Sequence, residues 1–282
     1  MHMLSDAVRS LIESGLHLQR QAQLAEAEDI YREALLVAPQ HPIVLHLLGT
    51  VVGQAGRWFE AIDLLQQSLR IQPADPKAWN NLATAFLDAG HCESAREAAQ
   101  RALSLAPDYS AARFSWASAC YGVERFSEAV DAFRLLATTS SPHKQLAWPG
   151  MWRAAAAGCD WAAAKQASVA VDEMLARGEM VLSPFDTLMY RDDPLLHRIS
   201  AESLIEQTLK REVALDPVTQ GQAHWVTQSP KIRLAYISAD FHEHATAYLM
   251  AELFESHDRQ KFEIIAVSFG PDDGSAMRQR LH

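Results

Sequence analysis

Small residues and prolines recur at a fixed step of 34 residues through the first 109 positions. Pro39, Pro73 and Pro107 each close a similar segment, EALLVAP, QSLRIQP and RALSLAP. Two sets of small residues keep the same step, namely Gly15, Gly49 and Ala83, and Ala27, Ala61 and Ala95. A period of this length indicates stacked copies of one supersecondary unit.

Each unit is predicted to be a helical hairpin. The small residues mark the points where two helices cross closely, and large residues such as Leu48, Leu65 and Trp79 fill the space around them. Gly56 and Gly90 align at the turn between the helices. The proline helps to end the second helix because it has no N–H to donate. The predicted units are 8–41, 42–75 and 76–109, with a degraded fourth unit at 110–143.

The pattern becomes less regular after the fourth unit. The alanine-rich stretch 151–178 is predicted to form one more helix pair that closes the stack, and 199–212 a weaker helical segment. Residues 213–230 lose the helical period and contain two prolines, a glycine and several polar residues. This composition is typical of a linker.

A strand, a helix and a second strand are predicted in the last fifty residues. The runs KIRLAYIS (231–238) and FEIIAVSFG (262–270) are nearly continuously apolar, and 246–256 has the pattern of a helix with Thr246 as its N-cap. A βαβ unit implies a parallel sheet with a right-handed crossover. One such unit leaves strand edges and a sheet face uncovered, so we expect further polypeptide to complete the sheet.

Candidate chemistry gathers in the loop after the first predicted strand. Asp240, His242, Glu243 and His244 lie within five residues there. Ligands of open α/β sheets bind beyond the carboxyl ends of the strands, so this loop has the position of a functional site. A metal at His242 and His244 is disfavoured because no clear third ligand accompanies them. In the repeats, Asn81 is the residue expected to bond a peptide backbone, the alternative being that it is a solvated helix position.

Charge and cysteine content narrow the functional classes. The chain has 282 residues and a formal net charge of −10, which argues against a nucleic-acid binder. Its three cysteines are odd in number and far apart, which favours a reducing, cytoplasmic environment. No signal peptide and no apolar run long enough for a membrane span is evident, so we expect no membrane association.

The repeat resembles the tetratricopeptide repeat in its period, small positions and prolines. The strand followed by Asp240-Phe241-x-x-His244, the HDxxxFE stretch at His257 and the Pro-Asp-Asp-Gly-Ser run at 271–275 resemble the O-linked N-acetylglucosamine transferases. That resemblance implies an α-helical tetratricopeptide-repeat solenoid followed by the beginning of an α/β Rossmann-like GT-B domain. It implies repeats over 1–143, a degenerate repeat and connecting helices over 144–212, and the N-terminal part of the GT-B domain over 231–282.

The same resemblance implies an activity. The family transfers N-acetylglucosamine from UDP-GlcNAc to a Ser or Thr hydroxyl with inversion, without an essential metal or cofactor. His244 is then expected to position the acceptor or act as base, with positioning preferred, and Asp240 to orient the loop. Asn81 is expected to contact an acceptor peptide held by the repeats. The nucleotide-binding residues are expected in a catalytic half outside this chain.

Two departures from the family pattern and two alternatives remain. Ala245 stands where the family has proline after the loop histidine, and the positions equivalent to Asn81 in the first two repeats are Glu13 and Leu47. The chain could instead be an interaction scaffold without its own catalysis. It could also belong to a GT-B enzyme that uses another nucleotide sugar.

Overall fold

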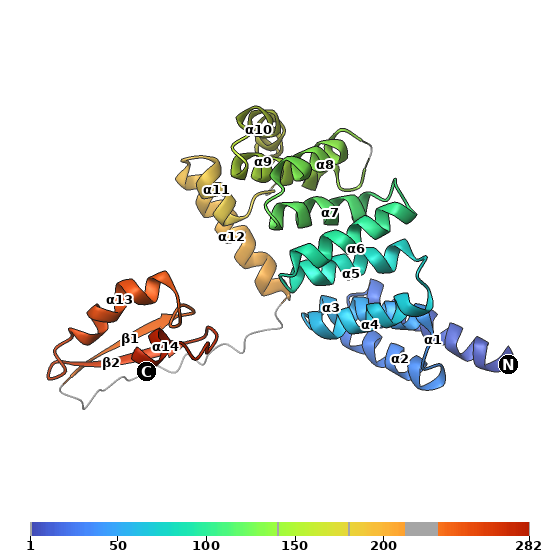
Figure 1. The fold of residues 1–282 in the computed structure, drawn as a ribbon, viewed down its shortest axis with the longest axis horizontal. Helices are drawn as coiled ribbons and strands as arrows, with labels where there is room; N and C mark the ends of the chain where they lie inside the picture. The colour runs from blue at the N-terminus through green and yellow to red at the C-terminus, as the bar shows by residue number, and fades with distance from the viewer. Residues whose placement is uncertain (1, 140, 180, 212–230, 282) are drawn as a thin grey trace. The chain divides into compact units, whose positions relative to one another are not determined.

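The computed structural model describes residues 2–139, 141–179, 181–211 and 231–281 (Figure 1). The chain divides into two compact units, Met1–Glu212 and Val213–His282, which are described separately. The predicted linker at 213–230 lies outside the described residues. No helix in the described ranges is both long and apolar enough to cross a membrane.

The first unit is a stack of helical hairpins (Figure 1), which confirms the predicted helical solenoid. Its helices are α1 (His2–Arg20), α2 (Leu24–Val37), α3 (Pro42–Gln54), α4 (Trp58–Ile71), α5 (Pro76–Asp88), α6 (Cys92–Leu105), α7 (Ser110–Gly122), α8 (Phe126–Thr138), α9 (Lys144–Ala157), α10 (Trp161–Ala176), α11 (Pro184–Tyr190) and α12 (Pro194–Arg211). Buried residues form one core from Val8 to Ala99 and a second from Ala117 to Leu182.

The small residues lie at close helix crossings, as predicted. A Cβ added to Gly15 would lie 2.3 Å from the Tyr31 ring, and one added to Gly49 would lie 2.9 Å from Leu65. Ala27 and Ala61, at the second small position, are fully buried. A larger side chain at these positions would force the two helices of a hairpin apart, because protein interiors leave no spare volume.

The turn inside each hairpin uses a left-handed residue. Gly56 and Gly90 have φ of 81° and 78°, and Ala22 and Glu124, at the same repeat position, both have φ of 60°. Only glycine adopts this conformation without a steric cost. The turn geometry therefore persists in repeats whose sequence has lost the glycine.

The fifth hairpin begins earlier than predicted. Its first helix starts at Lys144, 34 residues after Ser110, and contains Pro149, whereas the sequence pattern placed the start at 151. Proline normally interrupts a helix. Here Pro149 is buried and the adjoining Gly150 lies against the Phe133 ring, so packing on α8 retains the helix.

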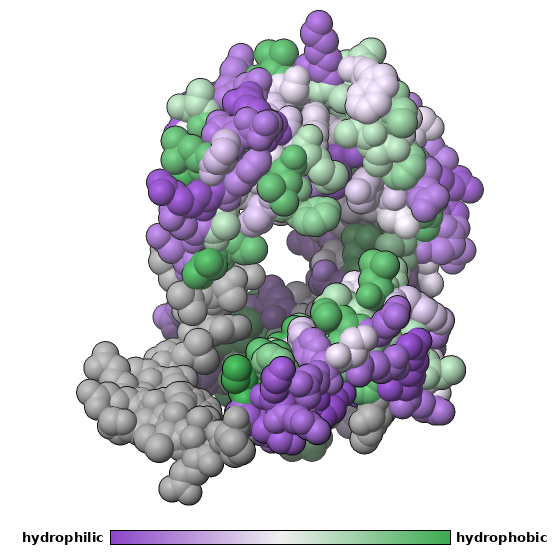
Figure 2. Space-filling view, turned by 90° about the vertical axis from the view of Figure 1, so that its left-hand side faces the viewer, coloured by the Kyte–Doolittle hydropathy of each residue, from purple (hydrophilic) through white to green (hydrophobic). Residues whose placement is uncertain are grey.

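Two short elements complete the first unit. Helix α11 was not predicted, although Ser183 and Asp186 form a capping box that the sequence SPFD could have revealed. Helix α12 begins at Pro194 rather than at 199, and the Asp193 carboxylate accepts hydrogen bonds from the Leu195 and Leu196 N–H groups. Large apolar side chains such as Phe185 stay exposed, and Figure 2 shows hydrophobic patches among hydrophilic residues on one face.

The second unit is the predicted βαβ arrangement with one further helix. It comprises β1 (Ile232–Ser238), α13 (Ala245–Glu255), β2 (Phe262–Ser268) and α14 (Ala276–Arg280). The two strands described here pair in parallel, from Ile232 opposite Phe262 to Ser238 opposite Ser268. Helix α13 begins at Ala245 with His244 as its N-cap, so the predicted Thr246 cap is wrong.

The two faces of this sheet differ in burial. On one face Tyr236 contacts Phe254 of α13, with ring centroids 4.7 Å apart, and its hydroxyl bonds to His257 at 2.8 Å. On the other face Ile237 and its partner Val267 are 68% and 45% exposed. Strands of parallel sheets are normally covered on both faces, whereas the apolar side chains of Ile237 and Val267 are exposed here.

Candidate functional site

Two loops meet at the carboxyl edge of the sheet. The loop after β1, residues 239–244, leads into α13, and the loop after β2, residues 269–275, leads into α14. Because the strands are parallel and in register, both loops leave the sheet on the same edge. The structure thus brings the predicted loop next to a second one, which contains the Pro-Asp-Asp-Gly-Ser run at 271–275.

His244 is held through one nitrogen of its ring. Its Nδ1 accepts a hydrogen bond from the Thr246 N–H at 3.2 Å and so caps α13. An accepting Nδ1 carries no proton, so in the neutral ring the proton is on Nε2. The side chain is 45% exposed, and Nε2 makes no hydrogen bond within the described part of the chain. In this state the ring presents a donor to its surroundings.

Asp240 lies near the ring without bonding to it. Its Oδ2 is 3.8 Å from His244 Nδ1, longer than a hydrogen bond, and its main-chain N–H donates to Ser238 Oγ at 3.0 Å. Nδ1 can accept a hydrogen bond from the Thr246 N–H only without a proton, and it can donate one to Asp240 only with a proton. If Nδ1 gains a proton, the Thr246 bond is lost and Asp240 becomes the natural partner of the N–H.

Asp273, which belongs to the Pro-Asp-Asp-Gly-Ser run at 271–275, joins the two loops. Its Oδ2 accepts the Glu243 N–H at 2.9 Å, and its Oδ1 accepts the Ser275 N–H at 3.0 Å. The bond from Glu243, followed by those from Ser275, lowers the pKa of Asp273 from 3.8 to about 2. A lowered carboxylate pKa adds stability above pH 3.8, and this stability is lost as the pH falls through about 2.

Arg278 holds the first loop from α14. Its Nη1 donates to the Phe241 carbonyl at 2.9 Å and to Ser268 Oγ at 2.8 Å. Its Nε is buried without a hydrogen bond and lies 3.7 Å from Asp272 Oδ1. Arg278 lies one turn after the Ser275 cap of α14, a position from which its side chain can reach back across the loops. Its contact with Phe241 depends on tertiary structure and is not evident from the sequence.

His242 and Glu243 both have partners in the structure. His242 Nδ1 is 3.7 Å from Asp273 Oδ2, and the Tyr248 hydroxyl donates to the Glu243 carboxylate. The bond to Glu243 raises the pKa of Tyr248. Across the described ranges, no three His, Cys, Asp or Glu side chains come together as a metal site would require.

Asn81 lies in a polar cluster between α3 and α5. Its Nδ2 bonds to His46 Nε2 at 2.8 Å and to Thr50 Oγ1 at 2.9 Å, while His46 Nδ1 faces Asp75 Oδ2 at 3.3 Å. Both amide protons are thus used inside the protein, and only Oδ1 is left to accept a bond from a peptide. The expected peptide contact stays a prediction, restricted by this geometry to one acceptor.

The neighbouring Asn80 is not a solvated position. It is 7% exposed, and its Oδ1 accepts a hydrogen bond from Ser115 at 3.0 Å. The adjacent asparagines therefore each link α5 to a different neighbour, Asn81 to α3 and Asn80 to α7.

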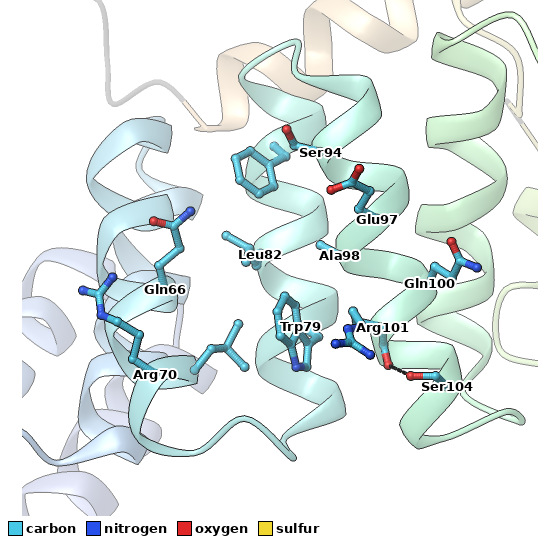
Figure 3. Close-up of a pocket in the computed structure, with 12 residues that line it drawn as sticks. Gln66, Arg70, Trp79, Leu82, Ser94, Glu97, Ala98, Gln100, Arg101 and Ser104 are labelled. Atoms are coloured by element: carbon cyan, nitrogen blue, oxygen red, sulfur yellow. Dashed lines mark hydrogen bonds between the residues drawn. The ribbon is translucent and has the colours of Figure 1, made fainter.

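A groove of about 860 Å³ lies over α4, α5 and α6 (Figure 3). Trp79 and Phe86 of α5 line it, and its polar residues include Arg101 and Glu97 of α6. Asn81 is two positions from Trp79, about 200° around the helix, so it lies on another side of α5. The groove and the Asn81 cluster are separate surfaces, and the groove lining carries both signs of charge.

Comparison with known proteins shows which families these units match. Residues 6–74 and 80–143 match tetratricopeptide repeats, and residues 198–282 match Glycosyl transferase family 41. The chain joins tetratricopeptide repeats to the start of a family 41 glycosyltransferase region. The family 41 match includes α12 as well as the sheet and both loops, so it begins before the predicted boundary at 231.

Two curated relatives carry the same kind of name. A Caenorhabditis elegans UDP-N-acetylglucosamine–peptide N-acetylglucosaminyltransferase is 24% identical over 135 residues, 44% of this chain and 12% of that protein. A probable enzyme of the same name from Arabidopsis thaliana is 26% identical over 108 residues, 36% of this chain and 11% of that protein. The chain therefore matches about a tenth of the length of these relatives.

The repeats also match solved structures. A MamA structure from Desulfovibrio magneticus superposes with a TM-score of 0.52 at 15% identity, covering 61% of this chain and 94% of that one. At this identity the match shows the fold alone, which is a tetratricopeptide-like helical solenoid.

Proposed function

We propose that the family 41 region is the first part of a catalytic domain that transfers N-acetylglucosamine from UDP-GlcNAc to a Ser or Thr hydroxyl of a protein. The observation that carries this proposal is the coincidence of the family 41 match with the two loops at the carboxyl edge of the sheet. The donor follows from the names of the two relatives.

His244 acts in this proposal through Nε2. With Nδ1 held by the Thr246 N–H, Nε2–H donates to an oxygen of the acceptor or the sugar and fixes its orientation. A role as general base would need the other tautomer, with Nδ1–H turned to Asp240 and the helix cap broken. The observed geometry thus favours positioning over proton removal.

The reaction has two further requirements. Inversion needs the hydroxyl to attack in line with the leaving UDP, and the growing charge on the diphosphate needs a cation or a helix N-terminus. We propose that this stabilisation comes from side chains and main chain without an essential metal. The cysteines in the described ranges are unpaired, which suits a reducing compartment such as the cytoplasm.

The repeats are proposed to bind the acceptor protein. Asn81 contributes its Oδ1 as a single acceptor beside His46, rather than a bidentate amide. A scaffold without catalysis is the second candidate, favoured by the observation that the hairpins make up most of the described residues. The two candidates differ in whether sugar transfer depends on the loop at the sheet edge.

The deciding experiment compares His244→Ala with wild type in the full natural protein that contains this chain. Transfer of labelled sugar is measured separately from UDP-GlcNAc, UDP-glucose and UDP-galactose. The matched control is His17→Ala, at an exposed position of α1. We expect His244→Ala to lower kcat by about 100-fold, within the range that mispositioning costs, and His17→Ala to leave it unchanged. Wild-type rates in His244→Ala with folding intact would remove His244 from the site. Absence of transfer by wild type from each donor would favour the scaffold.

A further inference from the structure

The loop that carries His244 is held by main-chain contacts on both sides of His242. Arg278 donates a hydrogen bond to the Phe241 carbonyl, and Asp273 accepts one from the Glu243 N–H. Glu243 directly precedes His244. Both contacts come from the segment after β2, which lies thirty or more positions away in sequence. The local sequence of the loop does not supply either partner.

Both contacts are hydrogen bonds between a charged side chain and the main chain of the loop. The Asp273 carboxylate receives main-chain bonds from both loops at 2.9 and 3.0 Å, and charge-assisted bonds of this kind are stronger than neutral ones. Arg278 spans the carbonyl of Phe241 and the hydroxyl of Ser268 with one nitrogen. Its guanidinium is largely buried, with 21% of the side chain exposed.

From these contacts we infer that Asp273 and Arg278 are positioning residues for His244. By fixing the main chain at 241 and 243, they place the ring so that Nδ1 meets the Thr246 N–H and Nε2 keeps its proton. Neither residue touches the ring Nδ1 itself, so they act through the loop. The inference rests on the proposed function for its catalytic meaning, while the placement of the ring is a property of this chain alone.

A neighbouring ion pair provides a matched comparison. Arg280, two residues after Arg278 on α14, pairs with Glu255 of α13 through two bonds of 2.7 and 2.8 Å. This pair joins α14 to α13 and is exposed, with no contact to residues 239–244. A general loosening of the unit would follow from loss of either arginine, whereas displacement of His244 would follow only from loss of Arg278.

The experiment reads the protonation of His244 directly. The whole chain, 1–282, is labelled with ¹⁵N-histidine, and long-range ¹H–¹⁵N spectra at pH 7.5 give the tautomer of each ring. Wild type is compared with Asp273→Ala, Asp273→Asn, Arg278→Gln and the control Arg280→Gln. Circular dichroism follows the folding of each variant.

We expect His244 in wild type to be the Nε2–H tautomer. Asp273→Ala and Arg278→Gln convert it to a mixture of both tautomers, Asp273→Asn has a smaller effect, and Arg280→Gln leaves it unchanged. If Arg278→Gln or Asp273→Ala loses folded structure, the isosteric Asp273→Asn decides. An unchanged tautomer in the folded variants, or an equal change in Arg280→Gln, overturns the inference.

Transfer rates in the full natural protein separate this inference from the proposed function. If both hold, Asp273→Ala and Arg278→Gln lower kcat about tenfold or more, and neither adds to the loss in His244→Ala. If the proposed function fails, wild type transfers no sugar, yet the tautomer still changes in the variants. If only the inference fails, wild type transfers sugar and the tautomer stays fixed.

Discussion

At the scale of single residues, the left-handed turn position of the repeats gives a direct test of the fold. Glu124 has φ of 60° where the third repeat has Gly90 with φ of 78°. A side chain in this conformation costs about 1–2 kcal/mol, partly offset because glycine makes the unfolded chain more flexible. We predict that Glu124→Gly raises the free energy of unfolding by about 0.5–1 kcal/mol.

The reverse change checks the same reasoning. Gly90→Ala is expected to lower the free energy of unfolding by about 1 kcal/mol, although no atom lies within 4 Å of the added Cβ. The control is Glu97→Gly at an exposed position of α6, which should lower the free energy of unfolding by about 1 kcal/mol because glycine is unfavourable inside a helix. Urea unfolding measures all three, and a loss in Glu124→Gly equal to that of Glu97→Gly would contradict the prediction.

Residue-level prediction from sequence succeeded where the requirement was local. Gly15 and Gly49 were expected at helix crossings, and each lies against a large side chain of the next helix. The cap of α13 was predicted as Thr246 because hydroxyl residues are common caps, but the His244 ring takes that role. The contact of Asp273 with the Glu243 N–H joins residues thirty apart, and no local pattern reveals such a bond.

At the scale of elements, the cluster between α3 and α5 makes the stability of the repeats depend on pH. Burial lowers the pKa of His46, and the nearby Asp75 opposes this only in part. The neutral ring accepts the Asn81 amide through Nε2 and faces Asp75 through Nδ1. Protonation would remove the acceptor that Asn81 uses.

The sign of the pH dependence follows from the direction of the pKa shift. His46 binds a proton more readily in the unfolded chain, whose pKa is 6.5, than in the folded one. The stabilisation is therefore complete above pH 6.5 and is lost as the pH falls through the lower folded pKa. We predict that His46→Gln reduces this loss between pH 7.5 and 5, in denaturant titrations at each pH. His17→Gln, an exposed control, should retain the wild-type slope, and an unchanged slope in His46→Gln would refute the prediction.

Element boundaries were predictable except where proline or short length intervened. Helix α9 starts at Lys144, ahead of the alanine-rich stretch predicted from 151, because its packing on α8 outweighs the cost of Pro149. Helix α11 has seven residues, too few for an apolar period to emerge, and only its capping box marks it. The strands of the second unit were placed within two residues because each is one continuous apolar run.

At the scale of the whole molecule, one face of the sheet exposes apolar side chains that parallel sheets normally bury. Ile237 and Val267 stand opposite each other on it, and Ile265 lies one step along the same face. We predict that chain 1–282 binds a hydrophobic dye and self-associates at high concentration. Ile237→Thr with Val267→Thr should weaken both, measured by dye fluorescence and sedimentation velocity.

The control for this prediction is an exposed apolar residue of the first unit. Leu36→Thr removes an apolar side chain that is 84% exposed on α2 and does not belong to the sheet. It should leave self-association unchanged, because scattered apolar residues are ordinary on protein surfaces. If Leu36→Thr has the same effect as the double variant, the sheet face is not the surface that mediates self-association.

The fold class was predictable from the sequence, whereas the working geometry of the candidate site was not. The 34-residue period and the two apolar runs were enough for a helical solenoid followed by an α/β unit. His244 and Asp240 were placed correctly in one loop, but their distance and the capping role of the ring depend on where α13 begins. Those details arise from contacts between segments far apart in the chain.

The regular hairpins also have a consequence for the order of folding during synthesis. Each hairpin contacts mainly its neighbours, so a repeat can fold once the next one has left the ribosome. The two strands, in contrast, join residues thirty positions apart, such as Ile232 and Phe262, and require the intervening helix to close the loop first. The helical repeats would therefore be complete while the two-stranded unit is still emerging.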